Sequence, residues 1–307
     1  MADTPQHPRL TILLPAHNEA EAIGPTLEEL KRVMAQIPDH EILVVDDGST
    51  DDTAARAESL GARVIRRIRK GGSGAARRTG ILAARGEIIV MMDADGSYDP
   101  ATIPAMLRLF PTYDQVNGAR DREMGTTPWL RAPVKKLLRL LASYLSGVPI
   151  PDLNTGLKAF KRDIMMRYLW VLPEGFSCVT TMTLAFLCND HNVAYVPTTY
   201  RKRIGFSKFH PLKDTARYLL TIIRMITYFK PLSVFLPMAG GFFLLAVLKS
   251  LHSFFIGTLP DGAPLHRLQF SDLLLFAAAG MTLLTGLLAD LIVSTQRQRA
   301  FERTVGA

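Results

Sequence analysis

Two pairs of carboxylates follow apolar runs of the chain, and their spacing suits a divalent cation and a phosphorylated ligand. The pairs are Asp46-Asp47 and Asp93-Ala94-Asp95. Two carboxylates separated by one residue offer the oxygen ligands that Mg²⁺ and Mn²⁺ prefer. A cation held there would neutralise the charge that develops on a departing diphosphate. The spacing of Asp93 and Asp95 therefore predicts a metal-assisted reaction of a nucleotide-activated group.

The first pair stands in the sequence Asp46-Asp47-Gly48-Ser49, which is suited to binding a nucleoside. A carboxylate at the end of a strand can accept hydrogen bonds from a base or a ribose hydroxyl, and the glycine permits the turn. A helix cap made by Ser49 or Asp51 would explain the same residues, and both interpretations can hold together.

A glycine-rich segment, Gly71–Gly74, lies between the two pairs and follows Lys70. It lacks the spacing of a Walker phosphate loop, so it is a weaker indication of a phosphate site. A flexible glycine loop next to a cation can still contact a diphosphate, and we therefore expect Lys70 near the donor.

Short apolar runs and the helical segments between them predict the elements that position these residues. We expect strands over residues 10–14, 41–45, 63–67, 87–92 and 115–119, and helices over 18–35, 75–84 and 100–110 and after Asp51. Asn18 and Glu21 have the spacing of a capping box for the first helix. Strands that alternate with such helices form a parallel sheet covered on both faces, and ligands bind at the carboxyl ends of its strands.

The pattern changes after Arg120. Further strands are expected over residues 156–160 and 193–200, with a helix over 179–189 between them. Two segments carry basic residues on one helical face and apolar residues on the other, which is typical of helices at a membrane interface. These segments are 129–145 and 213–229. The first of them could equally be an ordinary helix packed on the domain.

Two long apolar runs predict membrane spans, Leu232–Leu248, which extends to about Ile256, and Phe270–Ser294. Each can cross about 30 Å of hydrocarbon. Basic residues precede the first run and follow the second, so the positive-inside rule places both termini in the cytosol. The expected parts are a catalytic domain over 1–210, an interface helix over 211–230, a two-helix hairpin over 231–296 and a cytosolic tail over 297–307. A soluble hairpin buried against a partner is the alternative.

The composition narrows the classes of protein to which the chain can belong. Its net charge is +8 and 48% of its residues are hydrophobic, which fits a soluble domain with a short membrane part. The basic residues recur along the chain instead of forming one patch, which favours phosphates and a membrane surface over nucleic acid. Cys178 and Cys188 lie too far apart in one expected helix to be bridged, and the polar N-terminus shows no signal peptide. The domain is therefore expected in a reducing cytosol.

Several motifs resemble those of family 2 glycosyltransferases, in family order, over about residues 8–230. They are Leu13–Glu19, Val44–Asp51, Asp93-Ala94-Asp95, Asn117-Gly118-Ala119-Arg120 and Asp152–Phe160. The chain is most similar to the polyprenyl-phosphate branch, which includes dolichol-phosphate mannose synthases and bacterial polyprenyl-phosphate glucosyltransferases. A trailing pair of spans is typical of the bacterial members of that branch. Two positions depart from the pattern: His17 stands where relatives often have Tyr or Phe, and Gly96-Ser97 where they often have Leu-Gln.

The resemblance implies a GT-A fold, which is Rossmann-like, and a role for individual residues. The nucleotide-sugar would be lined by Pro15, His17, Glu19, Asp46, Asp47, Lys70, Asp93 and Ala94. Mg²⁺ or Mn²⁺ would be bound by Asp93 and Asp95, with Asp95 as the surer ligand. The acceptor phosphate would be held by Arg120, Arg131, Arg203 and Lys208, the last two from a loop that closes over the site. Asp95 and Asp152 are the expected catalytic residues, since Asp152 stands where a general base is proposed in relatives.

The implied reaction is inverting transfer of a sugar from a UDP- or GDP-linked donor to a polyprenyl or dolichyl phosphate at the cytosolic membrane face. Such an acceptor is already an anion at neutral pH, so the main tasks are positioning two anions and stabilising the leaving diphosphate. We therefore expect Asp152 to orient the acceptor or the metal more than to remove a proton. The implied partners are the donor, the lipid and the membrane, without nucleic acid, and many relatives form homo-oligomers.

Three alternatives stand beside this interpretation. A processive polysaccharide synthase would need several spans and usually a Gln-x-x-Arg-Trp motif, which neither Trp129 nor Trp170 provides. A tethered glycosyltransferase with a non-lipid acceptor and a non-catalytic membrane scaffold would both carry such a hairpin. The intact Asp93, Asp95 and Arg120 argue against the scaffold.

Overall fold

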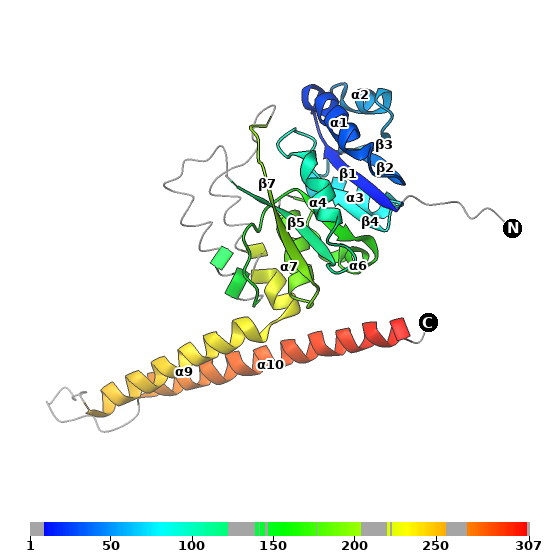
Figure 1. Cartoon of the computed structure of the whole chain (residues 1–307). Helices are drawn as coiled ribbons and strands as arrows, with labels where there is room; N and C mark the ends of the chain where they lie inside the picture. The colour runs from blue at the N-terminus through cyan, green and yellow to red at the C-terminus, as the bar shows by residue number, and fades with distance from the viewer. Residues whose placement is uncertain are drawn as a thin grey trace. The chain divides into compact units, whose positions relative to one another are not determined.

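The protein is described by a computed structural model that covers residues 9–121, 139–140, 142–144, 147–175, 177–203, 220–221, 223–255 and 269–305. The chain divides into two compact units, Met1–Ile222 and Ile223–Ala307. Figure 1 draws the first unit mainly in blue to green and the second in yellow to red.

A seven-stranded sheet forms the first unit, in the order β3-β2-β1-β4-β6-β5-β7. Its strands are β1 (Leu10–Ala16), β2 (His40–Asp46), β3 (Arg63–Arg66), β4 (Ile88–Met91), β5 (Gln115–Arg120), β6 (Lys158–Lys161) and β7 (Val193–Thr198). β1 pairs in parallel with β2 and β4, β2 with β3, and β5 with β7. The carboxyl ends of these strands form one edge of the sheet, which we call the carboxyl edge.

The strand β6 is the exception, because it runs antiparallel to both β4 and β5. The chain leaves β5 at the carboxyl edge and re-enters the sheet from that same edge. A strand that enters there has to run in the reverse direction. The predicted parallel, covered sheet is thus confirmed for β1 to β5, and a reversed strand is inserted into it.

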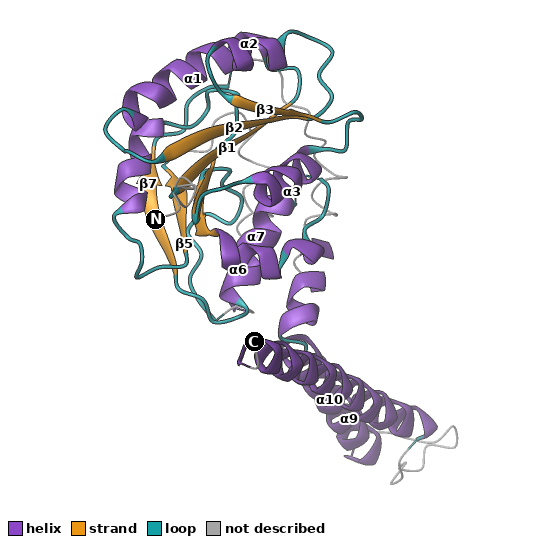
Figure 2. Cartoon of the chain, turned by 90° about the vertical axis from the view of Figure 1, so that its right-hand side faces the viewer, coloured by secondary structure: helices purple, strands orange, loops and turns teal. Residues whose placement is uncertain are grey.

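Helices cover both faces of the sheet (Figure 2). They are α1 (Ala20–Met34), α2 (Thr53–Ser59), α3 (Ser73–Ala83), η1 (Pro100–Thr102), α4 (Ile103–Leu107), α6 (Arg162–Arg167), η2 (Leu169–Val171) and α7 (Cys178–Leu187). Alternate side chains of β1 enter different cores, as expected for a strand buried on both faces. Ile12 and Leu14 pack with residues of α1 and α4, whereas Leu13 packs with residues of α3, α6 and α7.

Two long helices, α9 (Leu232–Phe255) and α10 (Phe270–Val305), form the second unit. They confirm the two predicted apolar segments, and each is long and apolar enough to cross a membrane. Only 11% of each apolar stretch is buried, so their surfaces suit lipid and not a protein core. Within this unit, Nζ of Lys249 lies 2.7 Å from Oδ1 of Asp272 on the other helix. Pairing lowers the cost of placing both charges near the end of a span.

The two predicted amphipathic helices lie largely outside the described residues. Within them, residues 139–140, 142–144, 220–221 and 223–229 are helical. The predicted helix over 100–110 is shorter than expected and ends at Leu107. Both cysteines are free and buried, as predicted.

Candidate active site

Three neighbouring strands, β2, β1 and β4, end side by side at the carboxyl edge. The predicted donor residues lie at or just after these ends: Pro15, His17 and Glu19 on β1, Asp46 and Asp47 on β2, and Asp93, Ala94 and Asp95 on β4. Most of the carboxylates are buried, and a carboxylate removed from water needs hydrogen-bond donors or a cation. The contacts of each carboxylate therefore indicate what it can still bind.

Asp93 is held by a cation from inside the domain. Nη2 of Arg77, on α3, donates to its Oδ1 at 2.6 Å, and Arg77 is only 5% exposed. Gly156 lies against the same carboxylate, where a side chain would collide with it. Asp93 is thus neutralised and fixed on two sides. The sequence did not identify Arg77, since a single arginine in a helix is usually read as a surface charge.

Asp95 is held more weakly than Asp93. Its Oδ1 accepts hydrogen bonds from the backbone N of Ser97 at 3.1 Å and from the Ser97 hydroxyl. The nearest cation is Arg203, whose Nη1 lies 3.7 Å from Oδ2. Burial, and then the neighbouring charge of Asp93, raise the pKa of Asp95 above its ordinary value. This carboxylate would therefore gain more than Asp93 from a bound cation.

The pair Asp93 and Asp95 fits a divalent cation that is shared with a substrate. Mg²⁺ is commonly bound by one or two carboxylates together with substrate phosphates and water. Across the described parts of the chain, no three His, Cys, Asp or Glu side chains gather into a metal cluster. The protein would thus supply Asp95, with Asp93 beside it, and the phosphates and water would complete the coordination.

Asp46 and Asp47 hold the loops that follow β2 and β3. Oδ1 of Asp46 accepts from the backbone N of Ser49 at 3.1 Å and from its hydroxyl. Asp47 accepts from the backbone N of Gly71 and Gly72, at 3.0 Å and 2.7 Å, and forms an ion pair with Arg67. These residues are at the predicted place, and they shape the surface there through the loops.

The glycine-rich loop is closed by the protein itself. The backbone N groups of Gly74 and Ala75, at the start of α3, donate to the carbonyl of Glu174 at 2.8 Å and 3.2 Å. A side chain at Gly74 would collide with the backbone of Pro173 and Glu174. The glycine therefore permits close approach of two backbones, and these amides do not form the predicted diphosphate contact. The exposed Lys70 precedes the loop and stays a predicted donor contact.

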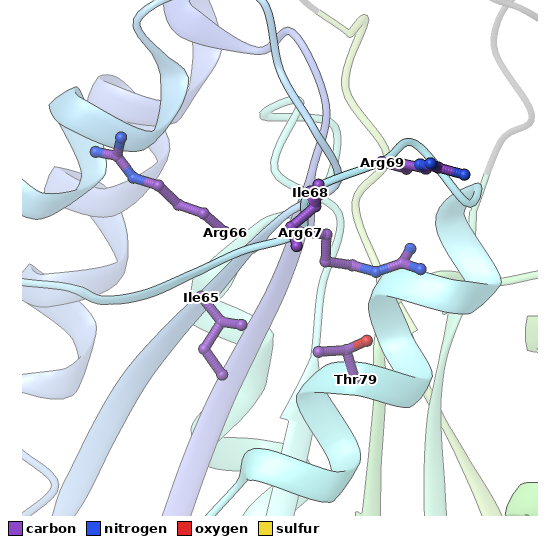
Figure 3. Close-up of a pocket in the computed structure, with 6 residues that line it drawn as sticks. All are labelled: Ile65, Arg66, Arg67, Ile68, Arg69 and Thr79. Carbon is purple, nitrogen blue, oxygen red and sulfur yellow. The ribbon is translucent and has the colours of Figure 1, made fainter.

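A shallow hollow beside this loop lies between β3 and α3 (Figure 3). It is lined by Ile65, Arg66, Arg67, Ile68, Arg69 and Thr79. Arg66 and Arg67 leave the chain in opposite directions, and Arg67 points toward α3. None of the lining residues is a predicted site residue, so we do not assign the active site to this hollow.

The predicted capping box is wrong. The residue before α1 is Glu19, and no side chain of the Asn18–Glu21 segment caps the helix. The backbone N of Ala20 instead donates to Oδ2 of Asp51 at 3.1 Å, so the loop after β2 caps α1. Asn18 has a left-handed backbone, with φ of 54°, and its Oδ1 accepts from Thr50 N at 2.8 Å. The loops after β1 and β2 are thereby fixed to each other.

A bidentate ion pair lies at the end of β5. Nε and Nη2 of Arg120 donate to the two oxygens of Asp152 at 2.7 Å and 2.9 Å. The backbone N of Asn154 adds a further hydrogen bond at 3.0 Å. Burial disfavours the charge of Asp152, but the Arg120 contacts outweigh it and lower the pKa of this carboxyl. An ionised carboxylate with its oxygens engaged is suited to orienting Arg120 and poorly suited to removing a proton.

The segment after β7 joins this pair to Asp93 and Asp95. The ring of Tyr200 lies 5.2 Å from Arg120 Cζ and 5.1 Å from the ring of Tyr98. The Tyr98 hydroxyl accepts from the backbone N of Gly156 at 2.6 Å. Arg203 then reaches Asp95. The other two predicted acceptor residues, Arg131 and Lys208, lie outside the described residues.

Sequence reasoning also missed Lys158, which is fully buried at the start of β6. Its Nζ donates to Oδ1 of Asn117 at 3.0 Å and to Oγ1 of Thr183 at 2.7 Å. Burial lowers the pKa of Lys158 to about 7. The signal available in the sequence was a lysine inside a short apolar strand.

The sequence resembles those of known proteins. It matches the family model "Glycosyl transferase family 2" over residues 11–169. Dolichyl-phosphate hexose transferase of Haloferax volcanii is 30% identical over 218 residues, covering 70% of this chain and 93% of the relative. Polyprenol monophosphomannose synthase of Mycolicibacterium smegmatis is 32% identical, covering 65% and 80%. Dodecaprenyl-phosphate galacturonate synthase of Rhizobium johnstonii is 27% identical and covers 95% and 90%.

Solved structures show the same fold. Glucosyl-3-phosphoglycerate synthase from Mycobacterium tuberculosis, in complex with Mg²⁺ and uridine-diphosphate, superposes with a TM-score of 0.56 at 21% identity, covering 71% of this chain and 79% of that one. The complex of that enzyme with Mn²⁺ and uridine-diphosphate-glucose gives a TM-score of 0.54, covering 71% and 77%. At this level of identity the match establishes a GT-A-like fold.

Proposed function

The chain belongs to glycosyltransferase family 2, and we propose that it transfers a sugar from a nucleotide-sugar to a polyprenyl phosphate at the cytosolic face of a membrane. The relatives named above for dolichyl-, polyprenol- and dodecaprenyl-phosphate support the lipid acceptor. The two apolar helices support a membrane location. The basic residues that flank them favour both termini in the cytosol. The donor would carry UDP or GDP.

The donor would lie across the ends of β1, β2 and β4. Its nucleoside would rest on Pro15 and His17 and on the loops that Asp46 and Asp47 hold. Its diphosphate would lie next to Asp95, where bound Mg²⁺ or Mn²⁺ would stabilise the charge of the leaving group. Arg77 holds Asp93 in place beside it.

The acceptor phosphate would approach from the end of β5, where Arg120 presents a guanidinium fork. Asp152 engages the Nε–Nη2 edge of that guanidinium by two hydrogen bonds, and the ring of Tyr200 lies against it, so the phosphate would meet the guanidinium from its Nη1 side. Because the phosphate is already an anion, it can attack the anomeric carbon directly and invert its configuration. Asp152 therefore acts in this proposal by orienting Arg120.

The observation that carries the proposal is that the donor residues and the acceptor residues occupy different positions along the carboxyl edge of the sheet. A weakly held carboxylate, Asp95, lies on the donor side, and a rigidly oriented arginine, Arg120, lies on the acceptor side. Tyr98 and Tyr200 lie between these two positions and hold the strand ends together. Two anions need such a divided site if they are to meet without repelling each other.

The test uses membranes that contain the full-length protein, with undecaprenyl or dolichyl phosphate and Mg²⁺ or Mn²⁺. Radiolabelled UDP- and GDP-sugars are added one at a time, with EDTA and Asp95→Ala as controls. We expect metal-dependent label in the organic phase with one donor class. Label confined to water-soluble product would reject the lipid acceptor and support a tethered enzyme. Absence of turnover with every donor would favour the scaffold.

A further inference from the structure

Each carboxylate of the Asp93-Ala94-Asp95 motif is paired with an arginine, and the two arginines differ in how exposed they are. The Arg77 side chain is 6% exposed and lies 2.6 Å from Asp93, so it is a permanent part of the domain. The Arg203 side chain is 40% exposed and lies 3.7 Å from Asp95, so it is easily separated from its partner. Arg77 is enclosed by the domain, whereas Arg203 is partly exposed and can move into water.

The chain that carries Arg203 is anchored just before it. The backbone N of Arg201 donates to the carbonyl of Ser97 at 2.8 Å. Nη1 of Arg201 contacts both oxygens of Glu29 at 2.9 Å, and Nη2 lies 3.3 Å from Asp99. These contacts hold residues 200 and 201 beside the metal-binding residues. The Arg203 guanidinium itself reaches the Tyr200 hydroxyl at 3.3 Å.

We propose that the Arg203 guanidinium takes the place of the divalent cation at Asp95 and is displaced when that cation binds. Two cations cannot share one buried carboxylate oxygen, because their mutual repulsion is poorly screened there. Asp93 offers no alternative place, since Arg77 already occupies it. The displaced guanidinium stays within reach of the site because Arg201 anchors the chain.

This inference deepens the proposed function. The role of Arg203 after its displacement rests on that function. Once released from Asp95, the guanidinium can contact the diphosphate of the donor, to which a planar fork binds well. Cation binding would thus both fill the site and supply a second cation for the leaving group. Arg203 is therefore a positioning residue of the empty site and a ligand-binding residue of the filled one.

The test is a Mn²⁺ titration of the full-length protein in detergent, without nucleotide or lipid phosphate, with free Mn²⁺ followed by electron paramagnetic resonance. Asp95→Ala gives the background of unrelated sites. Arg203→Ala should bind Mn²⁺ about 3- to 10-fold more tightly than the unmodified protein, the range expected for removing a partly exposed competing cation. Lys202→Ala removes the same charge from the neighbouring exposed residue and should change the affinity less than about twofold.

Equal tightening by Arg203→Ala and Lys202→Ala would overturn the inference, because it would indicate a general charge effect. Unchanged or weaker Mn²⁺ binding by Arg203→Ala, or no binding that depends on Asp95 in either protein, would overturn it as well. The Mn²⁺ affinity of Arg203→Lys should fall between those of the unmodified protein and Arg203→Ala, because lysine keeps the charge but loses the guanidinium fork. The titration contains no sugar donor and no acceptor, so its outcome is independent of whether the proposed transfer reaction is correct.

Discussion

At the ends of β3-β2-β1-β4, Asp46, Asp47 and Asp95 accept hydrogen bonds from backbone amides and hydroxyls of neighbouring loops, whereas in β6-β5-β7 the buried charges of Asp152 and Lys158 contact mainly other side chains. Asp47 contacts two glycine amides, and Asp95 contacts both donors of Ser97. Asp152 depends on the fork of Arg120, and Lys158 on two neutral side chains. The first arrangement tolerates exchange of a bound cation, because the backbone stays in place when the cation leaves. The second is a rigid unit that loses stability when one member is removed.

The largest expected effect is on Asp95, where the comparison predicts loss of activity without loss of folding. Asp95→Ala should lower transfer by about a thousandfold, or ~4 kcal/mol in the activation barrier, because the leaving diphosphate loses its cation. The melting temperature should not fall, since burial of this charge already works against the folded state. Radiolabel transfer and thermal denaturation measure the two effects. A collapse of the melting temperature would place Asp95 in the second kind of arrangement.

Asp152 should behave in the opposite way, with a large effect on stability. Asp152→Asn leaves Arg120 buried without its counter-charge and should cost about 3 kcal/mol of unfolding free energy at neutral pH. The folded-state pKa is lowered, so the stabilisation is present above the ordinary value of 3.8 and is lost as the pH falls through the folded pKa. The difference between variant and unmodified protein should therefore narrow in acid. Denaturant unfolding at pH 7 and near pH 3 tests this, and a difference that stays constant would contradict it.

Gly156 gives a further test of the comparison, because it precedes β6 and lies against Asp93, which follows β4. A methyl group at this position, just before β6, would push against the carboxylate of Asp93 after β4. Gly156→Ala should reduce transfer about 30-fold, or ~2 kcal/mol, through a shift of that carboxylate. Gly24→Ala, on α1 with no atom within 4 Å of the added methyl, is the matched control and should keep full activity. Equal activity of the two variants would show that Asp93 tolerates displacement.

Lys158 should affect stability in a way that depends on pH. Its folded-state pKa is lowered to about 7 from 10.5, so the unfolded chain binds the proton more tightly between these values. Its contribution to stability therefore increases as the pH rises through this window, by at most about 1.4 kcal/mol per pH unit. Lys158→Met should abolish that increase, whereas Lys202→Met, at an exposed lysine, should retain it. Melting temperatures between pH 7 and 9 measure it, and a parallel rise in both variants would refute the assignment.

The sequence predicted the features of the fold that depend on local residue patterns. Alternating apolar runs predicted strands and helices close to those observed, and the carboxylates that follow β2 and β4 have to lie at the carboxyl edge once the strands are parallel. The contacts of Asp93 and Asp47 could not be predicted in the same way. Arg77 and Arg67 differ from surface arginines only by their burial, which is a property of the folded chain. The reversal of β6 likewise depends on where the chain re-enters the sheet.

The capping box failed for a related physical reason. Asn18 and Glu21 have the right spacing, but Asp51, on a loop more than thirty residues away, supplies a stronger acceptor for the same amide. Local propensity is overridden whenever a tertiary partner competes for the same donor. The sequence pattern could not predict the burial of Lys158, because a charged residue in a short strand usually faces water.

The Glu174 carbonyl that closes the start of α3 also bears on how the chain is made. The amides of Gly74 and Ala75 donate to a carbonyl about one hundred residues later in the chain, and β4 pairs with β6, which is also synthesised later. During synthesis the early half of the sheet therefore has an open edge and an uncapped helix until residue 174 has left the ribosome. The hairpin begins only at Leu232, several seconds later at about 5–20 residues per second. The catalytic domain can thus complete its fold in water before the first apolar helix requires a membrane.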